Sequence, residues 1–168
     1  MRLRIMSILA ALALVTACET PQQTTAATSG SGSGSGAGAQ GAARIAPGSQ
    51  EDLVVNVGDR VFFDFNKHTL KPDARKTLEK QAAWLKQHPS VRILVAGNCD
   101  ERGTREYNLA LGERRANSTK DYLVSLGVNP SRLKTISYGK ERPVALGSTE
   151  AAWAQNRNSI TSVVGAGS

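Results

Sequence analysis

Apolar side chains recur at helical spacing in two stretches of this 168-residue chain. The first stretch, residues 73–87, has Pro72 in its first turn, where proline is tolerated, and ends at His88-Pro89. Its apolar positions return every three or four residues, which predicts an amphipathic helix. These positions are Ala74, Leu78, Ala82 and Leu85.

A second helix is predicted between Thr104 and Gly127. Thr104 or a neighbour caps its start, Glu106 lies in its first turn, and Gly127 with Pro130 closes it. The inward stripe of this helix should consist of Leu109, Gly112, Ala116, Thr119, Leu123 and Leu126.

Short apolar runs predict the strands. Two of them, 54–57 and 61–65, flank a turn at Gly58-Asp59, and the others are 91–96, 133–138 and 160–164. Taking 61–65 as the first main strand, with 54–57 as a less regular extended piece before it, the order is β-α-β-α-β-β. This order predicts an α+β sandwich whose helices pack on one face of the sheet.

The N-terminal segment is patterned for export. Arg2 and Arg4 precede the apolar run Ile5–Val15, which is too short to span a bilayer. The run ends in Val15-Thr16-Ala17-Cys18, which resembles a bacterial lipobox. We therefore expect a lipoprotein signal over 1–17 and a lipidated Cys18; an ordinary cleavable signal is the alternative. Glu19 replaces the aspartate that often favours the inner membrane, so the outer membrane is the expected location.

Residues 18–48 and 49–168 differ in composition. The first segment contains the run Ser29–Gly36, which alternates serine and glycine, and predicts a flexible tether with a reach of roughly 30 Å on average. The second has the composition of one globular domain. Removal of Arg2 and Arg4 lowers the formal charge from +7 to +5, and the charges are interspersed, which argues against nucleic-acid binding.

Gly97–Ser118 carries most of the candidate chemistry, because a charged loop follows an apolar strand there. Asp100 and Arg115 suit a ligand with an ammonium and a carboxylate on one carbon, although a surface salt-bridge network is the alternative. A hydrolase or transferase would need Cys99 paired with His68, or two facing carboxylates, and the adjacent Asp100 and Glu101 diverge. Two scattered histidines and one usable cysteine predict no metal site, and no cofactor is expected.

Several short motifs resemble the OmpA-like peptidoglycan-binding domain family, and more closely its peptidoglycan-associated lipoproteins. The resemblance covers about residues 61–164. The motifs are Phe63-Asp64-Phe65, Gly97-Asn98-Cys99-Asp100, Arg102–Gly112, Arg115-Ala116, Leu126-Gly127, Arg132-Leu133, Ser137-Tyr138-Gly139, Pro143 and Asn156-Arg157.

The resemblance implies an α+β domain with a mixed sheet that binds peptidoglycan without catalysis. It implies that Asp100 and Arg115 hold the free end of diaminopimelate, with further contacts from Phe65, Asn66 and Lys67. The implied partners are the cell wall, the periplasmic propeller protein TolB and other Tol proteins, and the implied location is the periplasmic side of the outer membrane. A pure protein-interaction module remains an alternative.

Three positions depart from the family pattern. The family usually has Asp at the position of Asn66 and His at that of Asn98, and commonly a second Arg at that of Asn158. Asn66 removes a negative charge from the expected pocket rim, and Asn98 lacks a titratable ring. These departures bear on affinity more than on the class of ligand.

Overall fold

The computed structural model describes residues 45–166, so the expected signal segment, Cys18 and the tether up to residue 44 lie outside the described residues. Within the described part, none of the helices is long and apolar enough to cross a membrane. The elements are, in order, α1 (Gln50–Asp52), the π-helical turn η1 (Leu53–Val57), β1 (Arg60–Phe62), α2 (Pro72–Gln87), β2 (Val91–Asn98), α3 (Arg105–Ser125), the 3₁₀ turn η2 (Pro130–Arg132), β3 (Leu133–Gly139), α4 (Glu150–Asn156) and β4 (Asn158–Ala166).

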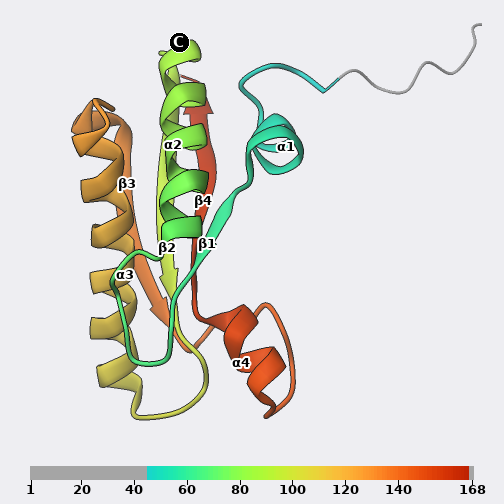
Figure 1. Ribbon diagram of the computed structural model, residues 1–168, viewed down its shortest axis with the longest axis vertical. Coiled ribbons are helices and arrows are strands. Elements are labelled where there is room, and N and C mark those ends of the chain that lie inside the picture. The colour runs from blue at the N-terminus through green and yellow to red at the C-terminus, as the bar shows by residue number, and fades with distance from the viewer. Residues whose placement is uncertain (1–44, 167–168) are drawn as a thin grey trace, which may run out of the picture. The chain divides into compact units, whose positions relative to one another are not determined.

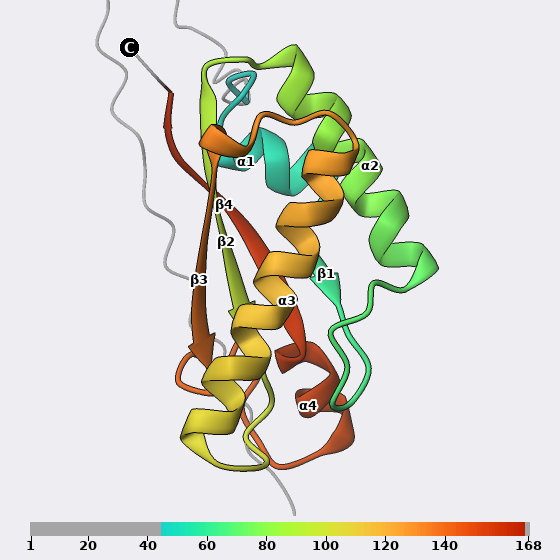
Figure 2. The same cartoon turned by 90° about the vertical axis from the view of Figure 1, so that its left-hand side faces the viewer.

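The four strands form one mixed sheet in the order β1-β4-β2-β3. The last strand, β4, lies between β1 and β2 and is antiparallel to both, whereas β2 and β3 are parallel. Helices α2 and α3 lie side by side on one face of this sheet, and α4 lies at its end (Figures 1 and 2). The predicted α+β sandwich is thus confirmed.

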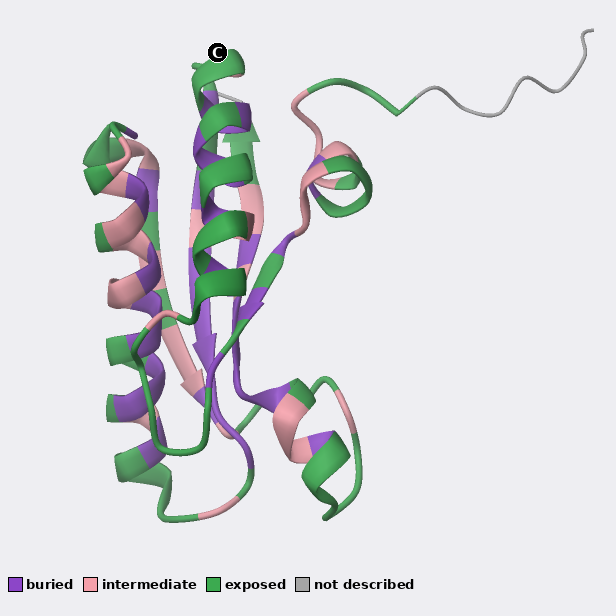
Figure 3. Ribbon diagram, in the orientation of Figure 1, coloured by how far each residue is buried: buried purple, intermediate pink, exposed green. Residues whose placement is uncertain are grey.

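The buried face of each long helix points toward the sheet (Figure 3). All four predicted apolar positions of α2 are buried, and so are Gly112, Ala116, Thr119 and Leu123 of α3. Leu109 and Leu126 are only partly buried. Near its N-terminal end, α3 instead buries Asn108, Leu111 and Arg115, which apolar periodicity alone does not select.

Two glycines allow α3 to approach β2 closely. A Cβ atom on Gly97 would lie 1.8 Å from the carbonyl oxygen of Gly112, and one on Gly112 would lie 2.3 Å from Ser137 Oγ. The helix backbone therefore rests directly on the strand. This contact brings the Arg115 side chain, one turn beyond Gly112, beside the end of β2.

The prediction of an extended segment at 54–57 is wrong, because these residues form η1. Ser49 Oγ accepts a hydrogen bond from Asp52 N, and Asp52 Oδ2 accepts one from Gly48 N, so the start of a helical turn is capped. This arrangement resembles a capping box, and the sequence Ser49–Asp52 was its available signal. Val54 and Val55 are 45% and 65% exposed, so the valines that suggested a strand face solvent.

Other strand boundaries also move. The observed strand β1 ends at Phe62, earlier than the predicted strand 61–65. Beyond it, one backbone hydrogen bond joins Phe63 N to Arg157 O. The strand predicted at 160–164 begins at Asn158. The connection before it contains α4, which Thr149 caps by accepting a hydrogen bond from Ala152 N.

Candidate functional site

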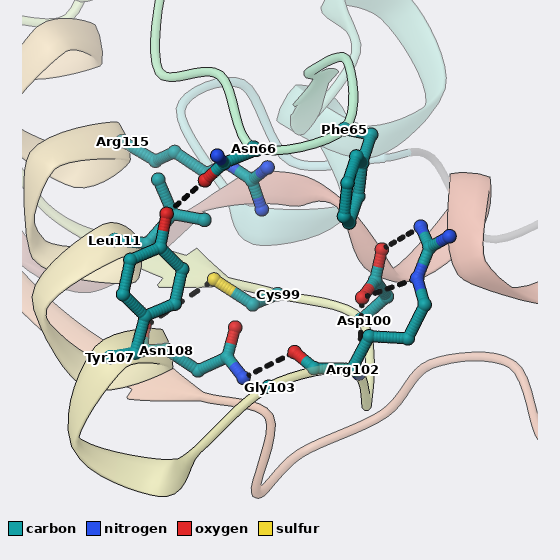
Figure 4. Close-up of a pocket in the computed structure, with 10 residues that line it drawn as sticks. All are labelled: Phe65, Asn66, Cys99, Asp100, Arg102, Gly103, Tyr107, Asn108, Leu111 and Arg115. Carbon is teal, nitrogen blue, oxygen red and sulfur yellow. Dashed lines mark hydrogen bonds and ion pairs between the residues drawn. The ribbon is translucent and has the colours of Figure 1, made fainter.

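A pocket opens where the loop after β1, the end of β2 and the start of α3 meet (Figure 4). Its cavity volume is about 150 Å³, below the range of roughly 300–1,000 Å³ that is usual for drug-sized ligands. The lining residues are Phe65, Asn66, Cys99, Asp100, Arg102, Gly103, Tyr107, Asn108, Leu111 and Arg115. The fold therefore brings Asp100 and Arg115 into one pocket, together with two of the three residues expected from the loop after β1.

Arg115 is a buried cation without an acidic partner among residues 45–166. Its side chain is fixed by backbone carbonyls: Nε donates to Lys67 O at 2.9 Å, Nη1 to Asn98 O at 2.7 Å and Nη2 to Asp64 O at 3.2 Å. The residue is 1% exposed, and this burial lowers the pKa of its guanidinium from the ordinary value. A carboxylate brought by a ligand would compensate this charge.

Asp100 lies on the opposite side of the pocket and is already paired. Arg102 Nη2 lies 2.7 Å from Asp100 Oδ2, and Arg157 Nη1 lies 3.3 Å from the same oxygen. Burial disfavours the charged carboxylate, but the hydrogen bonds from Arg102 and Arg157 outweigh it, so the pKa of Asp100 lies below its ordinary value. The carboxylate is therefore ionised at neutral pH.

The three expected loop residues contribute in different ways. Phe65 is 56% exposed and forms a wall of the pocket, and Asn66 forms part of its rim. Asn66 has a positive φ of 57°, and its Oδ1 accepts a hydrogen bond from Tyr107 Oη across the pocket mouth (Figure 4). Lys67 does not line the pocket; its backbone carbonyl holds Arg115 instead.

The start of α3 is tied to the loop that precedes it. Asn108 Nδ2 donates to Arg102 O at 2.8 Å and to Thr104 O at 3.0 Å. Thr104 caps the helix as predicted, accepting a hydrogen bond from Tyr107 N. These bonds fold the loop back along the helix, and this return lets Asp100 and Arg115 face the same pocket despite their separation in sequence.

The Cys99 thiol has the environment of a packing residue. It is 3% exposed, and its Sγ donates to Asn108 O at 3.4 Å. Burial raises the pKa of Cys99, which keeps the thiol protonated and weakly nucleophilic. His68, the partner that catalysis would require, is not among the pocket residues. Within residues 45–166 no group of three potential ligand side chains is arranged to hold a metal ion.

Sequence reasoning missed two arginines of the site. Neither Arg102 nor Arg157 is among the site residues expected from the sequence. Arg157 is buried, and besides Asp100 it contacts Phe63 O at 3.2 Å and Glu150 Oε1 at 2.7 Å. Arg102 lies in the motif Arg102–Gly112 and Arg157 in Asn156-Arg157, but neither motif by itself assigns the side chain a role. Arg102 pairs with Asp100 two residues before it, whereas Arg157 reaches Asp100 from a distant part of the chain.

Comparisons with known proteins agree with this architecture. The OmpA family model matches residues 62–157. The peptidoglycan-associated lipoprotein of Agrobacterium fabrum is 56% identical over 127 residues, which cover 76% of this chain and 72% of that protein. That of Rhizobium meliloti is 56% identical over 128 residues, covering 76% and 73% of the two chains.

Solved structures show the same fold. The peptidoglycan-associated lipoprotein from Burkholderia pseudomallei has a TM-score of 0.61 at 46% identity, covering 62% of this chain and 89% of that one. The C-terminal domain of Helicobacter pylori MotB is similar in fold alone, with a TM-score of 0.60 at 24% identity over 64% and 84% of the two chains. The relatives in Agrobacterium and Rhizobium are named as wall-associated lipoproteins rather than as enzymes, which confirms the expectation that this chain is not an enzyme. The chain therefore belongs to the OmpA family, and within that family to the peptidoglycan-associated lipoproteins.

Proposed function

We propose that this chain is an outer-membrane lipoprotein whose domain faces the periplasm and binds peptidoglycan non-covalently. The ligand is the free end of diaminopimelate in the peptide stem. Lipid on Cys18 and the tether of residues 18–48 would then join the membrane to the wall. The names of the relatives, the lipobox-like sequence and the charges of the pocket all support this proposal.

The observation that carries the proposal is the buried Arg115, which forms no ion pair with any described carboxylate. A buried charge is costly unless it is paired. Three of its five N–H groups bond to carbonyls, which leaves donors for a ligand carboxylate. Asp100 offers the opposite charge for the ammonium on the same carbon of diaminopimelate.

The remaining residues shape the mouth of the pocket. Phe65 supplies an apolar wall, Asn66 and Tyr107 bridge the rim, and the Lys67 carbonyl holds the Arg115 guanidinium in place. Fixed donors of this kind reduce the entropy that a ligand must overcome on binding. The pocket thus combines a positioned cation with a wall against which the carbon chain of diaminopimelate can pack.

Co-sedimentation of the full chain in detergent with diaminopimelate-containing sacculi tests this function. Arg115→Ala should weaken binding by about 2–5 kcal/mol, since one partner of a buried charge pair is removed. Arg114→Ala is the matched control, because Arg114 is the exposed neighbour on the same helix and should bind as wild type does. Sacculi whose diaminopimelate carboxylate is amidated should bind poorly to the unaltered chain.

The amidated sacculi separate ligand recognition from misfolding, because the protein is unchanged in that arm. Equal binding of amidated and free sacculi by the wild type would contradict the assignment of Arg115. A chain that binds purified TolB but no sacculi would favour the protein-interaction module instead. TolB and other Tol proteins are partners under the present proposal as well, so both ligands are measured with the same preparation.

A further inference from the structure

Arg102 wraps around the Asp100 carboxylate (Figure 4). Its backbone N and its Nε each donate to Asp100 Oδ1 at 3.2 Å, and its Nη2 donates to Oδ2 at 2.7 Å. Arg157 Nη1 supplies a fourth hydrogen bond, to Oδ2 at 3.3 Å. An ionised carboxylate has about four acceptor sites, so these four bonds saturate Asp100.

Two aromatic rings contact the Arg102 guanidinium. Its central carbon lies 4.0 Å from the ring centroid of Phe65 and 4.1 Å from that of Trp153, distances at which a cation is attracted to each ring. Phe65 belongs to the loop after β1 and Trp153 to α4, so two separate segments contribute. The result is a cation site, formed by a carboxylate and two rings, with a side chain of the protein already inside it.

The two arginines on Asp100 differ in how firmly they are held. The Arg157 side chain is 9% exposed and is also bonded to Phe63 O and Glu150. The Arg102 side chain is 31% exposed, and its only other described acidic partner is Glu150 at 3.8 Å. Arg102 is therefore the group that can leave Asp100 for solvent, whereas Arg157 stays as part of the framework.

We propose that the Arg102 guanidinium competes with the ammonium group of the ligand for the Asp100 carboxylate. This inference rests on the proposed function, since it concerns the same pocket. A ligand ammonium gains a bond to Asp100 only by displacing the Arg102 side chain, so its net contribution is small. Arg115 has no such competitor among residues 45–166, so the ligand carboxylate determines most of the affinity. Because of Arg102, the protein recognises the carboxylate of the ligand more strongly than its ammonium group.

The test is a cycle between a protein variant and a ligand variant. The full chain in detergent is titrated with a diaminopimelate-containing tripeptide whose distal amine is either free or acetylated. In the wild type the two peptides should bind within about threefold of each other. Arg102→Met keeps a long side chain between the rings and removes the charge, and there the free amine should bind at least about tenfold more tightly than the acetylated one, as expected for a charge-assisted hydrogen bond.

Two results would overturn the inference. One is a wild type that already loses about tenfold or more on acetylation, because Asp100 would then be open to the amine. The other is an Arg102→Met variant that binds both peptides more weakly by the same factor, which would make Arg102 a ligand contact. Trp153→Leu loosens the stack without altering Asp100 or Arg115 and should shift preference toward the free amine, to a smaller extent.

Failure of the proposed diaminopimelate binding would give a different set of results. If amidation of the distal carboxylate leaves wild-type affinity unchanged, or if neither peptide binds, the proposed function fails and this inference with it. If amidation abolishes binding but the amine cycle shows no coupling to Arg102, only the inference fails. Thermal unfolding of each variant, followed by far-UV circular dichroism, establishes that the folded state is compared throughout.

Discussion

Asn98 Nδ2 donates a 2.8 Å hydrogen bond to Asn158 Oδ1, although the two residues lie 60 positions apart in the sequence. Both are buried, at 3% and 0% exposure. These are two of the three positions that depart from the family pattern, where His and Arg are usual, so two of the departures meet in one contact. A neutral amide pair thus adjoins Cys99 of the pocket lining in sequence, and the backbone carbonyl of the same Asn98 accepts a hydrogen bond from Arg115.

The amide pair predicts non-additive stability. Asn158→Ala and Asn98→Ala should each lower the free energy of unfolding by about 1–3 kcal/mol, since each leaves a buried polar partner unsatisfied. The double variant should lose less than the sum, because it removes both partners together. Urea unfolding of the four proteins measures the coupling, and strictly additive losses would refute it. Asn98 Oδ1 finds no hydrogen-bond donor within residues 45–166, so part of this site is already unsatisfied.

Asp52 predicts a loss of stability in acid. Its carboxylate accepts hydrogen bonds from Trp84 Nε1, Asn56 Nδ2 and Gly48 N, which lower its pKa from 3.8 to about 2. A depressed folded-state pKa contributes stability that is complete above pH 3.8 and is lost as the pH falls toward 2. The difference in urea midpoint between wild type and Asp52→Asn should therefore shrink over this interval. A difference that stays constant down to pH 2 would mean that the charge contributes nothing.

Close packing between α3 and β2 predicts a severe effect of one methyl group. Gly97→Ala should destabilise the domain by about 1–3 kcal/mol or more, because its Cβ would overlap the Gly112 carbonyl. Gly165→Ala is the matched control, since a Cβ there meets no atom within 4 Å. Its thermal midpoint should stay near that of the wild type, and comparable losses in both variants would argue against the contact as the cause.

The Cys99 thiol should be unreactive and dispensable for binding. Because burial raises its pKa, iodoacetamide should modify it in the native protein at least about tenfold more slowly than after denaturation. Cys99→Ser should still co-sediment with sacculi. Release of soluble fragments from sacculi by the wild type, lost in Cys99→Ser, would instead restore the hydrolase interpretation.

The lipid anchor predicts the location of the chain. Cys18→Ala should prevent lipidation and transfer the protein from the membrane fraction to the soluble periplasmic fraction, because several acyl chains are needed for stable anchoring. Its affinity for sacculi should be unchanged, since the described pocket lies within residues 65–115. A variant that still fractionates with membranes would contradict lipidation at this residue.

Local pattern predicted the regular elements and missed the irregular ones. The period of Ala74, Leu78, Ala82 and Leu85 reports a buried face that one helix creates by itself, and the structure agrees with it. At Val54 and Val55 the same reasoning failed, because β-branched residues indicate a strand whether or not a partner strand exists. The cap at Ser49, a polar contact of a few residues, decided the local structure there.

The sequence by itself determined the two long helices, the runs that become strands, and the presence of Asp100 and Arg115 in a motif typical of the family. Only the tertiary structure decided that β4 lies between β1 and β2, that Lys67 contributes a carbonyl rather than a side chain, and that Arg157 joins Arg102 on Asp100. The physical reason is the range of the interactions. A helical stripe depends on neighbours three or four residues away, whereas the state of a charge depends on groups that long-range packing brings to it.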